Sequence, residues 1–105
     1  MITKDDLKIA FQVTAEDIAR ANELRESYSN LMGDNTDKCP TAFAIRRVLK
    51  QDDVSVGYTT VSVVWPDNEY VGYKFLNSTR STEHITTWDR TKVMKEWKGT
   101  LVRGN

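Results

Sequence analysis

The chain has 105 residues, enough for one domain with a modest hydrophobic core. Fifteen Lys and Arg balance fifteen Asp and Glu, and this zero net charge argues against non-specific binding to nucleic acid. The first residues show no secretory signal, one cysteine cannot form an internal disulfide, and no apolar run approaches the roughly 18 residues of a membrane span. We therefore expect a single soluble domain over residues 1–105, located in the cytoplasm, with no membrane partner.

A strand and a helix are predicted at the start of the chain. Thr14 is a candidate N-cap, and Glu16 and Asp17 fall in the first helical turn, where the helix dipole favours acidic side chains. The strand covers 7–13, and its alternate apolar positions are Leu7, Ile9, Phe11 and Val13. The helix covers 15–28, and its expected buried stripe is Ile18, Ala21, Leu24 and Tyr28.

Residues 29–38 are rich in Gly, Asn and Asp and are expected to form a mobile loop. A second helix over 40–50 follows, because Pro40 suits a first helical position. Cys39, just before it, is interpreted as a residue that starts the helix. A catalytic thiol needs a base, and the only histidine, His84, lies 45 residues away without a local catalytic signature.

The second half of the chain reads as strands and one helix. A strand near 54–57 precedes a hairpin of 59–65 with 70–76, joined by a turn that contains Pro66. A third helix over 78–90, capped by Ser78 or Ser81, would bury Ile85 and Trp88, and a last strand covers 96–102. The order β-α-α-β-β-β-α-β predicts an α+β fold, with a mainly antiparallel sheet and helices packed on one face.

Common catalytic and cofactor motifs are missing from the sequence. One Cys and one His are too few for a structural zinc site, and the five scattered glycines form no phosphate-binding loop. We therefore expect no metal, no cofactor and no enzymatic activity. His84, on a short polar helix, is expected to be solvated.

The second helix carries the main candidate surface. Its predicted core half comprises Ala42, Ala44, Ile45, Val48 and Leu49. The other half places Phe43 among three cations, Arg46, Arg47 and Lys50. Two interpretations are open: the chain itself covers the ring and the arginines are solvated, or this half binds a protein partner, a second copy of the chain or an anionic ligand.

The hairpin carries a second candidate surface, made of Trp65 at the start of the turn and Tyr70 and Lys74 on the outward face of the returning strand. Large aromatic side chains serve as anchors at interfaces, but in a small domain they also fill the core. Trp65, Tyr70 and Lys74 are therefore included as candidate binding residues.

Two segments carry a resemblance to a known group of proteins. VTAEDIARA at 13–21 and CPTAFAIRRVL at 39–49, followed by a valine-rich strand pair, resemble small accessory proteins encoded in tailed-bacteriophage and prophage genomes. The shared patterns are V-T-x-x-D-I, largely a helix-start signature, and the more distinctive C-P-x-A-x-A-x-R-R. The likeness covers most of the chain up to Val64. The group has no assigned activity, so the resemblance implies a phage origin rather than a mechanism.

A phage origin places the candidate surfaces in a biological context, because small accessory phage proteins often inhibit host processes, including CRISPR and nucleotide-signalling defences. The leading hypothesis is an anti-CRISPR-like inhibitor that binds a host protein through Phe43, Arg46, Arg47 and Lys50, together with the hairpin aromatics. The alternative is a homo-oligomer that sequesters a nucleotide-type signalling molecule, with Arg on phosphate and Phe or Tyr on the base. An enzyme that uses Cys39 ranks third.

Overall fold

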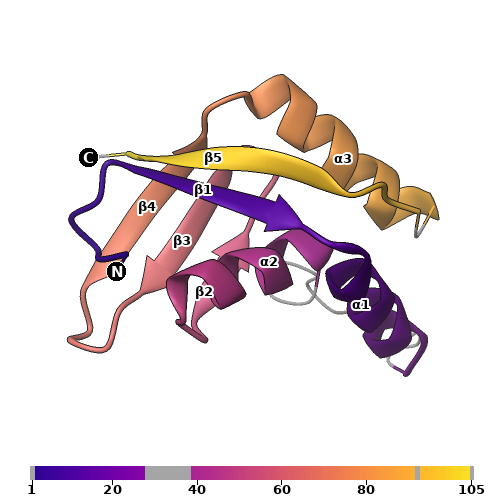
Figure 1. Cartoon of the computed structure of the whole chain (residues 1–105), viewed down its shortest axis with the longest axis horizontal. Coiled ribbons are helices and arrows are strands. Elements are labelled where there is room, and N and C mark those ends of the chain that lie inside the picture. The colour runs from indigo at the N-terminus through magenta and orange to yellow at the C-terminus, as the bar shows by residue number, and fades with distance from the viewer. Residues whose placement is uncertain (1, 28–38, 92, 105) are drawn as a thin grey trace.

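The computed structural model describes residues 2–27, 39–91 and 93–104. Over these ranges it contains three helices and five strands in the predicted order β-α-α-β-β-β-α-β (Figure 1). The elements are β1 (Lys8–Val13), α1 (Ala15–Ser27), α2 (Pro40–Leu49), β2 (Val54–Val56), β3 (Thr60–Val64), β4 (Tyr70–Phe75), α3 (Ser78–Thr91) and β5 (Trp97–Arg103). The predicted α+β class is confirmed.

The strands form one antiparallel sheet in the order β1-β5-β4-β3-β2. The last strand therefore lies between the first strand and the hairpin. Residues directly opposite each other share a face. The pairs Phe11 with Gly99, Leu101 with Phe75, Val71 with Val63, and Val63 with Val54 therefore place the apolar positions of all five strands on one side. The sheet is curled, and its concave side holds the core.

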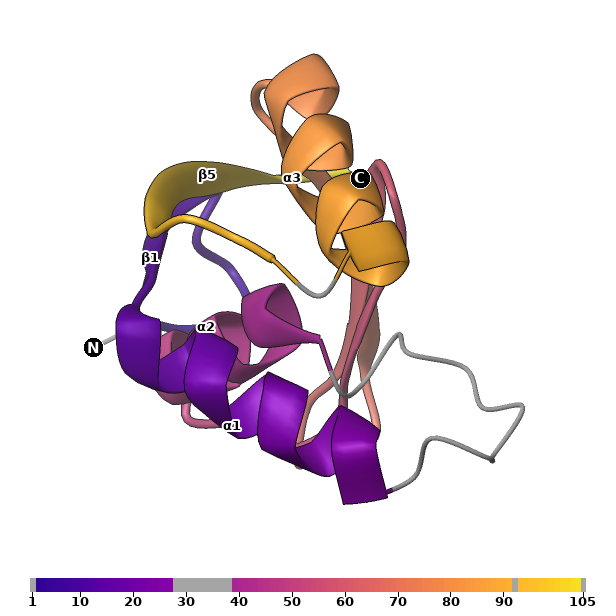
Figure 2. The same ribbon diagram turned by 90° about the vertical axis from the view of Figure 1, so that its right-hand side faces the viewer.

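All three helices lie on the concave side. Figure 2 shows α2 between β1 on one side and the hairpin strands on the other. The position of α3 follows from His84, which stacks on Trp97, an inward residue opposite Val13. The indole Nε1 of Trp88 donates a hydrogen bond of 2.7 Å to Oδ1 of Asn22, which ties α3 to α1.

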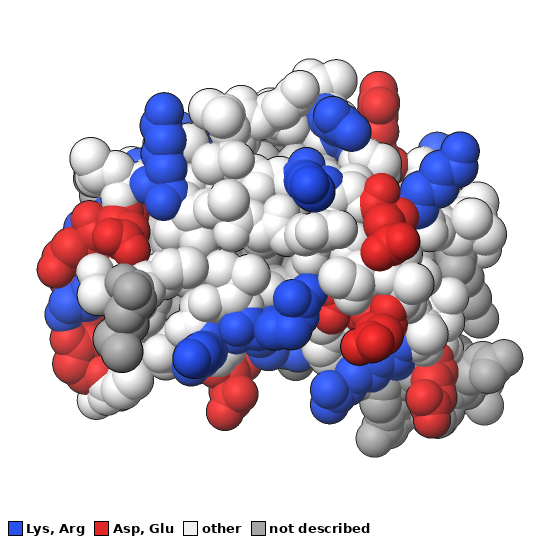
Figure 3. Space-filling view, in the orientation of Figure 1, with Lys and Arg blue, Asp and Glu red and all other residues white. Residues whose placement is uncertain are grey.

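The convex side of the sheet carries no described helix. Its outward residues include Lys8, Lys74 and Lys98, and all three are exposed. Figure 3 shows mostly uncharged surface over β1 and β5, with single Lys or Arg side chains standing on it and acidic groups toward its two ends. None of the helices described is both long and apolar enough to cross a membrane.

Some predictions for the first strand and the first helix are wrong, and others concern residues that the structure does not describe. Leu7 is 68 % exposed and precedes β1; only its carbonyl joins the sheet, where it accepts a 2.9 Å hydrogen bond from the Arg103 N–H. In the predicted stripe of α1, Ala21 is buried and Ile18 is partly buried. The side chain of Leu24, Tyr28 and the predicted loop 29–38 lie outside the described residues.

The predicted cap of the third helix is wrong. Asn77 caps α3: its side-chain Oδ1 accepts a hydrogen bond from the Arg80 N–H at 3.1 Å. The Asn77 carbonyl also accepts from the Ser81 N–H at 3.1 Å. Ser81 itself is buried within the helix, beside the predicted core residues Ile85 and Trp88, because it falls on the face that packs against the core.

Candidate functional site

The start of α2 is fixed by Cys39 and Pro40. Cys39 is the N-cap, in extended conformation, and its Sγ accepts a hydrogen bond from the Ala42 N–H at 3.4 Å. The thiol is buried, and burial raises its pKa to about 11. A thiol in that state is neutral at neutral pH and therefore a poor nucleophile. The interpretation of Cys39 as a helix-start residue agrees with this geometry.

Phe43 is partly buried and packs against the core, while two guanidinium groups lie over its ring. The central carbon of Arg46, one turn further along α2, lies 5.1 Å from the ring centroid. That of Arg20, from α1, lies 5.2 Å away. Cation–π contacts at such distances are favourable. The chain therefore covers part of this ring itself, through α1, as the first of the two open interpretations predicted. The arginines, which that interpretation left solvated, instead contact Phe43 and Asp17.

Arg47 is held by contacts with two other elements. Its Nη2 donates to Oδ2 of Asp17 on α1 at 2.7 Å and to the carbonyl of Gln12 on β1 at 3.0 Å. The side chain of Asp17 is only 10 % exposed, whereas that of Arg47 is 52 % exposed. Arg47 thus neutralises a nearly buried carboxylate and still presents part of its guanidinium to solvent.

Asp17 has a second role at the start of α1. Its Oδ2 accepts hydrogen bonds from the backbone N–H and the hydroxyl of Thr14, both at 3.0 Å. Thr14 Oγ1 in turn accepts from the Asp17 N–H at 3.3 Å. This reciprocal arrangement is a capping box. It confirms Thr14 as the N-cap and makes Asp17 the residue that links the cap of α1 to Arg47 of α2.

Lys50 ends α2 in the left-handed conformation, with φ 56°, and its N–H donates to the Arg46 carbonyl. Its side chain is exposed. We call the surface formed by Arg20, Phe43, Arg46, Arg47 and Lys50 the cationic face. Figure 3 shows a run of Lys and Arg atoms across the lower part of the molecule, where α2 lies. Of these five residues, only Arg20 was absent from the predicted surface, because no local sequence pattern predicts which part of α1 contacts Phe43.

The hairpin candidates separate onto two sides of the sheet. Trp65 is 6 % exposed and belongs to the core, so the expectation that its ring is available to a partner is wrong. Tyr70 and Lys74 point to the convex side and are exposed, Tyr70 by 64 %. Between them, Gly72 leaves a hollow of about 250 Å³ on that side.

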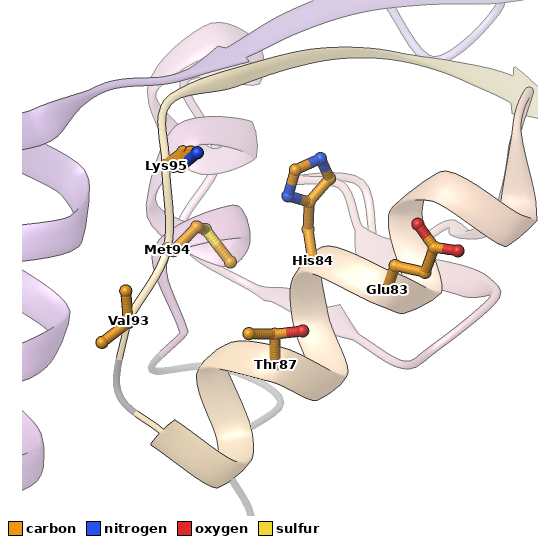
Figure 4. A pocket seen from close by; sticks show the side chains of 6 residues that line it. All are labelled: Glu83, His84, Thr87, Val93, Met94 and Lys95. Carbon is orange, nitrogen blue, oxygen red and sulfur yellow. The ribbon is translucent and has the colours of Figure 1, made fainter.

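His84 is only partly exposed to solvent, whereas the sequence predicted a solvated side chain. Its ring stacks on Trp97 with centroids 4.6 Å apart and an angle of 11° between planes. It lines an open pocket of about 280 Å³ between α3 and the segment leading to β5 (Figure 4). Figure 4 shows the ring rising from α3 beside the segment that carries Lys95 and Met94, with Glu83 on the other side of the ring from that segment. Burial lowers the pKa of His84 and Arg80 lowers it further, so the neutral ring is favoured.

Neither the arrangement of possible metal ligands among the described residues nor a comparison with known proteins assigns a function. Within 2–27, 39–91 and 93–104, no three His, Cys, Asp or Glu side chains lie close enough together to hold a metal ion. No protein-family model, no curated protein and no solved structure matches the chain. The two exposed surfaces, the cationic face and the convex side of the hairpin, are therefore the candidate binding regions.

Proposed function

We propose that the protein is a non-catalytic binding module that docks an acidic surface of a partner protein through its cationic face. One observation carries the proposal: the guanidinium groups of Arg20 and Arg46 lie over a partly buried phenylalanine, and Arg47, on the same helix as Arg46, is held by Asp17. Arginine and aromatic side chains in such a cluster are typical anchors of protein interfaces.

The fixed positions favour binding because less side-chain entropy is lost when a partner arrives. Arg47 uses one terminal nitrogen, Nη2, for both Asp17 and Gln12. A guanidinium has five N–H donors, so donors at Nη1 and Nε are left for a carboxylate of the partner. Lys50, exposed at the end of the same helix, extends the positive surface.

A protein partner fits this face better than a nucleotide does. The two guanidinium groups over the Phe43 ring would compete with a stacking base. The zero net charge of the chain also gives no broad attraction to a phosphate backbone. The resemblance to phage accessory proteins supplies the context: the partner would be a host protein, and binding would inhibit a host process such as a defence system.

Charge removal at matched positions tests the proposal. Arg20→Gln with Lys50→Gln removes two positive charges from the cationic face, and Lys8→Gln with Lys98→Gln removes two from the convex side of the sheet. We expect the first pair to weaken binding of a protein captured from host lysate by about tenfold or more, and the second pair to leave it within about twofold.

The partner is identified by mass spectrometry, and its affinity for each purified variant is measured by calorimetry at two salt concentrations. Wild-type affinity should fall as salt rises, because exposed charges are screened. Thermal unfolding checks that both double variants stay folded. Equal losses in the two variants, or full binding by Arg20→Gln with Lys50→Gln, would exclude the cationic face as the interface.

A further inference from the structure

The convex side of the sheet has a hollow formed by the absence of a side chain. Gly72 lies on β4 between the outward residues Tyr70 and Lys74, and a Cβ atom placed there would meet nothing within 4 Å. Across the hollow, the Gly104 N–H donates to the Gly72 carbonyl at 2.8 Å, and this second glycine also adds no side chain. The result is an open space of about 250 Å³ over the middle of β4.

One wall of the hollow is an aromatic ring held in place. The Tyr70 hydroxyl lies 2.7 Å from Oγ of Ser62, on the neighbouring strand β3. Ser62 pairs with Gly72 rather than with Tyr70, so this hydrogen bond directs the ring along the sheet toward the glycine. The ring is nevertheless 64 % exposed. A fixed, exposed aromatic face can stack a planar ring with little loss of side-chain entropy.

The opposite wall carries positive charge. Lys74 lies four residues from Tyr70, which places their Cα atoms roughly 13 Å apart along the strand. In the sheet register, Lys8 on β1 and Lys74 on β4 lie opposite Val102 of β5. The two cations therefore flank one position of β5 on the convex side. None of the outward positions of the five strands holds an acidic residue.

The charges at the Tyr70 end of the hollow help to define how a ligand would be oriented. The two carboxylates of the hairpin turn, Asp67 and Glu69, both form ion pairs with Lys4. Lys4, near the Tyr70 end, is therefore already paired with these carboxylates, whereas Lys74 forms no ion pair with any residue that the structure describes. A ligand with one planar and one anionic part would place the planar part on Tyr70 and the anion at Lys74.

We propose that this hollow binds a nucleoside monophosphate, with the base stacked on Tyr70, the sugar over Gly72 and the phosphate at Lys74. The site is on the opposite side of the fold from the cationic face and is independent of the proposed protein interface. Its volume is below the range of about 300–1,000 Å³ that encloses drug-sized ligands. The ligand is therefore partly solvated and binds with a dissociation constant in the micromolar to millimolar range.

Nuclear magnetic resonance with adenosine 5′-monophosphate as the probe tests the assignment directly. Titration into the ¹⁵N-labelled protein should shift the amides of Thr60, Gly72 and Lys74 and leave those of α2 in place. Adenosine alone and inorganic phosphate alone should each bind at least about tenfold more weakly, because each reaches only one wall. No shifts at these amides with 10 mM nucleotide would overturn the proposal.

The variant Gly72→Val tests the hollow without disturbing the fold. The backbone at Gly72 has no positive φ and the space is open, so valine, a good strand residue, fits while filling the site. We expect an unchanged or raised melting temperature and loss of the nucleotide-induced shifts, whereas Lys98→Gln on the same side keeps them. Nucleotide binding by Gly72→Val equal to wild type would overturn the assignment. Tighter binding of a single-stranded hexanucleotide, with shifts spreading to Lys98, would replace it by a nucleic-acid surface.

Discussion

His84 is stacked on Trp97, and its ring is partly removed from water. Burial is the largest influence on this side chain and lowers its pKa below the usual 6.5. Arg80, on the same helix, lowers the pKa further, while Glu83 raises it. Lys95 lies across the pocket. Protonation of His84 therefore costs free energy in the folded protein that it does not cost in the unfolded chain.

This difference predicts a pH dependence of stability. Because the folded pKa is the lower one, the unfolded chain binds the proton first as the pH falls. The contribution of His84 is fully present above about pH 6.5 and is lost as the pH falls from there through the folded pKa. Urea unfolding of wild type and His84→Gln at about pH 7.5 and pH 5.5 measures it. Wild type should lose more stability than the variant on acidification; parallel losses would contradict the assignment.

Asp17 shows what a local pattern can and cannot predict about a residue. Its place in the first turn of α1 follows from the sequence, since acidic residues are favoured there. Its burial and its ion pair with Arg47, 30 residues away, do not, because they depend on how α1 and α2 pack together. The same holds for Arg20 on Phe43. The candidate residues on α2 were recognised, but their contacts come from another helix.

The cap of α3 gives a prediction at the level of an element. Asn77→Ala removes the acceptor of the Arg80 N–H and should destabilise the protein by about 1 kcal/mol. Ser78→Ala changes the neighbouring residue, one of the two caps that the sequence predicted, and should have little effect because alanine is a good helix former. Chemical denaturation of both variants measures the two changes. A larger loss for Ser78→Ala than for Asn77→Ala would refute the cap assignment.

Element positions were largely predictable, whereas element partners were not. Alternating apolar residues gave the strands, and the hairpin pairs as expected because its turn is local. The place of β5 between β1 and β4 joins segments from opposite ends of the chain, and no local pattern encodes that pairing. The stacking of His84 on Trp97 follows from this arrangement of the sheet and α3. The burial of Trp65, in contrast, continues the local alternation of Val61 and Val63 on the core face.

At the scale of the whole molecule, the two sides of the sheet differ in how tightly they are filled. On the concave side, Phe11, Phe75 and Trp97 form an aromatic cluster across β1, β4 and β5, with ring centroids 5.3 to 6.5 Å apart. Gly99 lies beneath it: an added Cβ would fall 2.5 Å from Cζ of Phe11 and 2.9 Å from Cζ3 of Trp97. On the convex side, Gly72 has open space instead.

The same substitution at the two glycines should therefore have opposite effects. Neither glycine has a positive φ, so backbone strain does not enter the comparison. Gly99→Ala forces the rings apart and should cost about 1–3 kcal/mol, as overpacking of a filled core does. Gly72→Ala adds a methyl group to open space and should be neutral or stabilise by up to about 1 kcal/mol, because it restricts the unfolded chain. Thermal and urea unfolding of both variants measure the difference. Similar losses at the two positions would mean that the convex side is packed against something, and the hollow over Gly72 could then not receive a ligand.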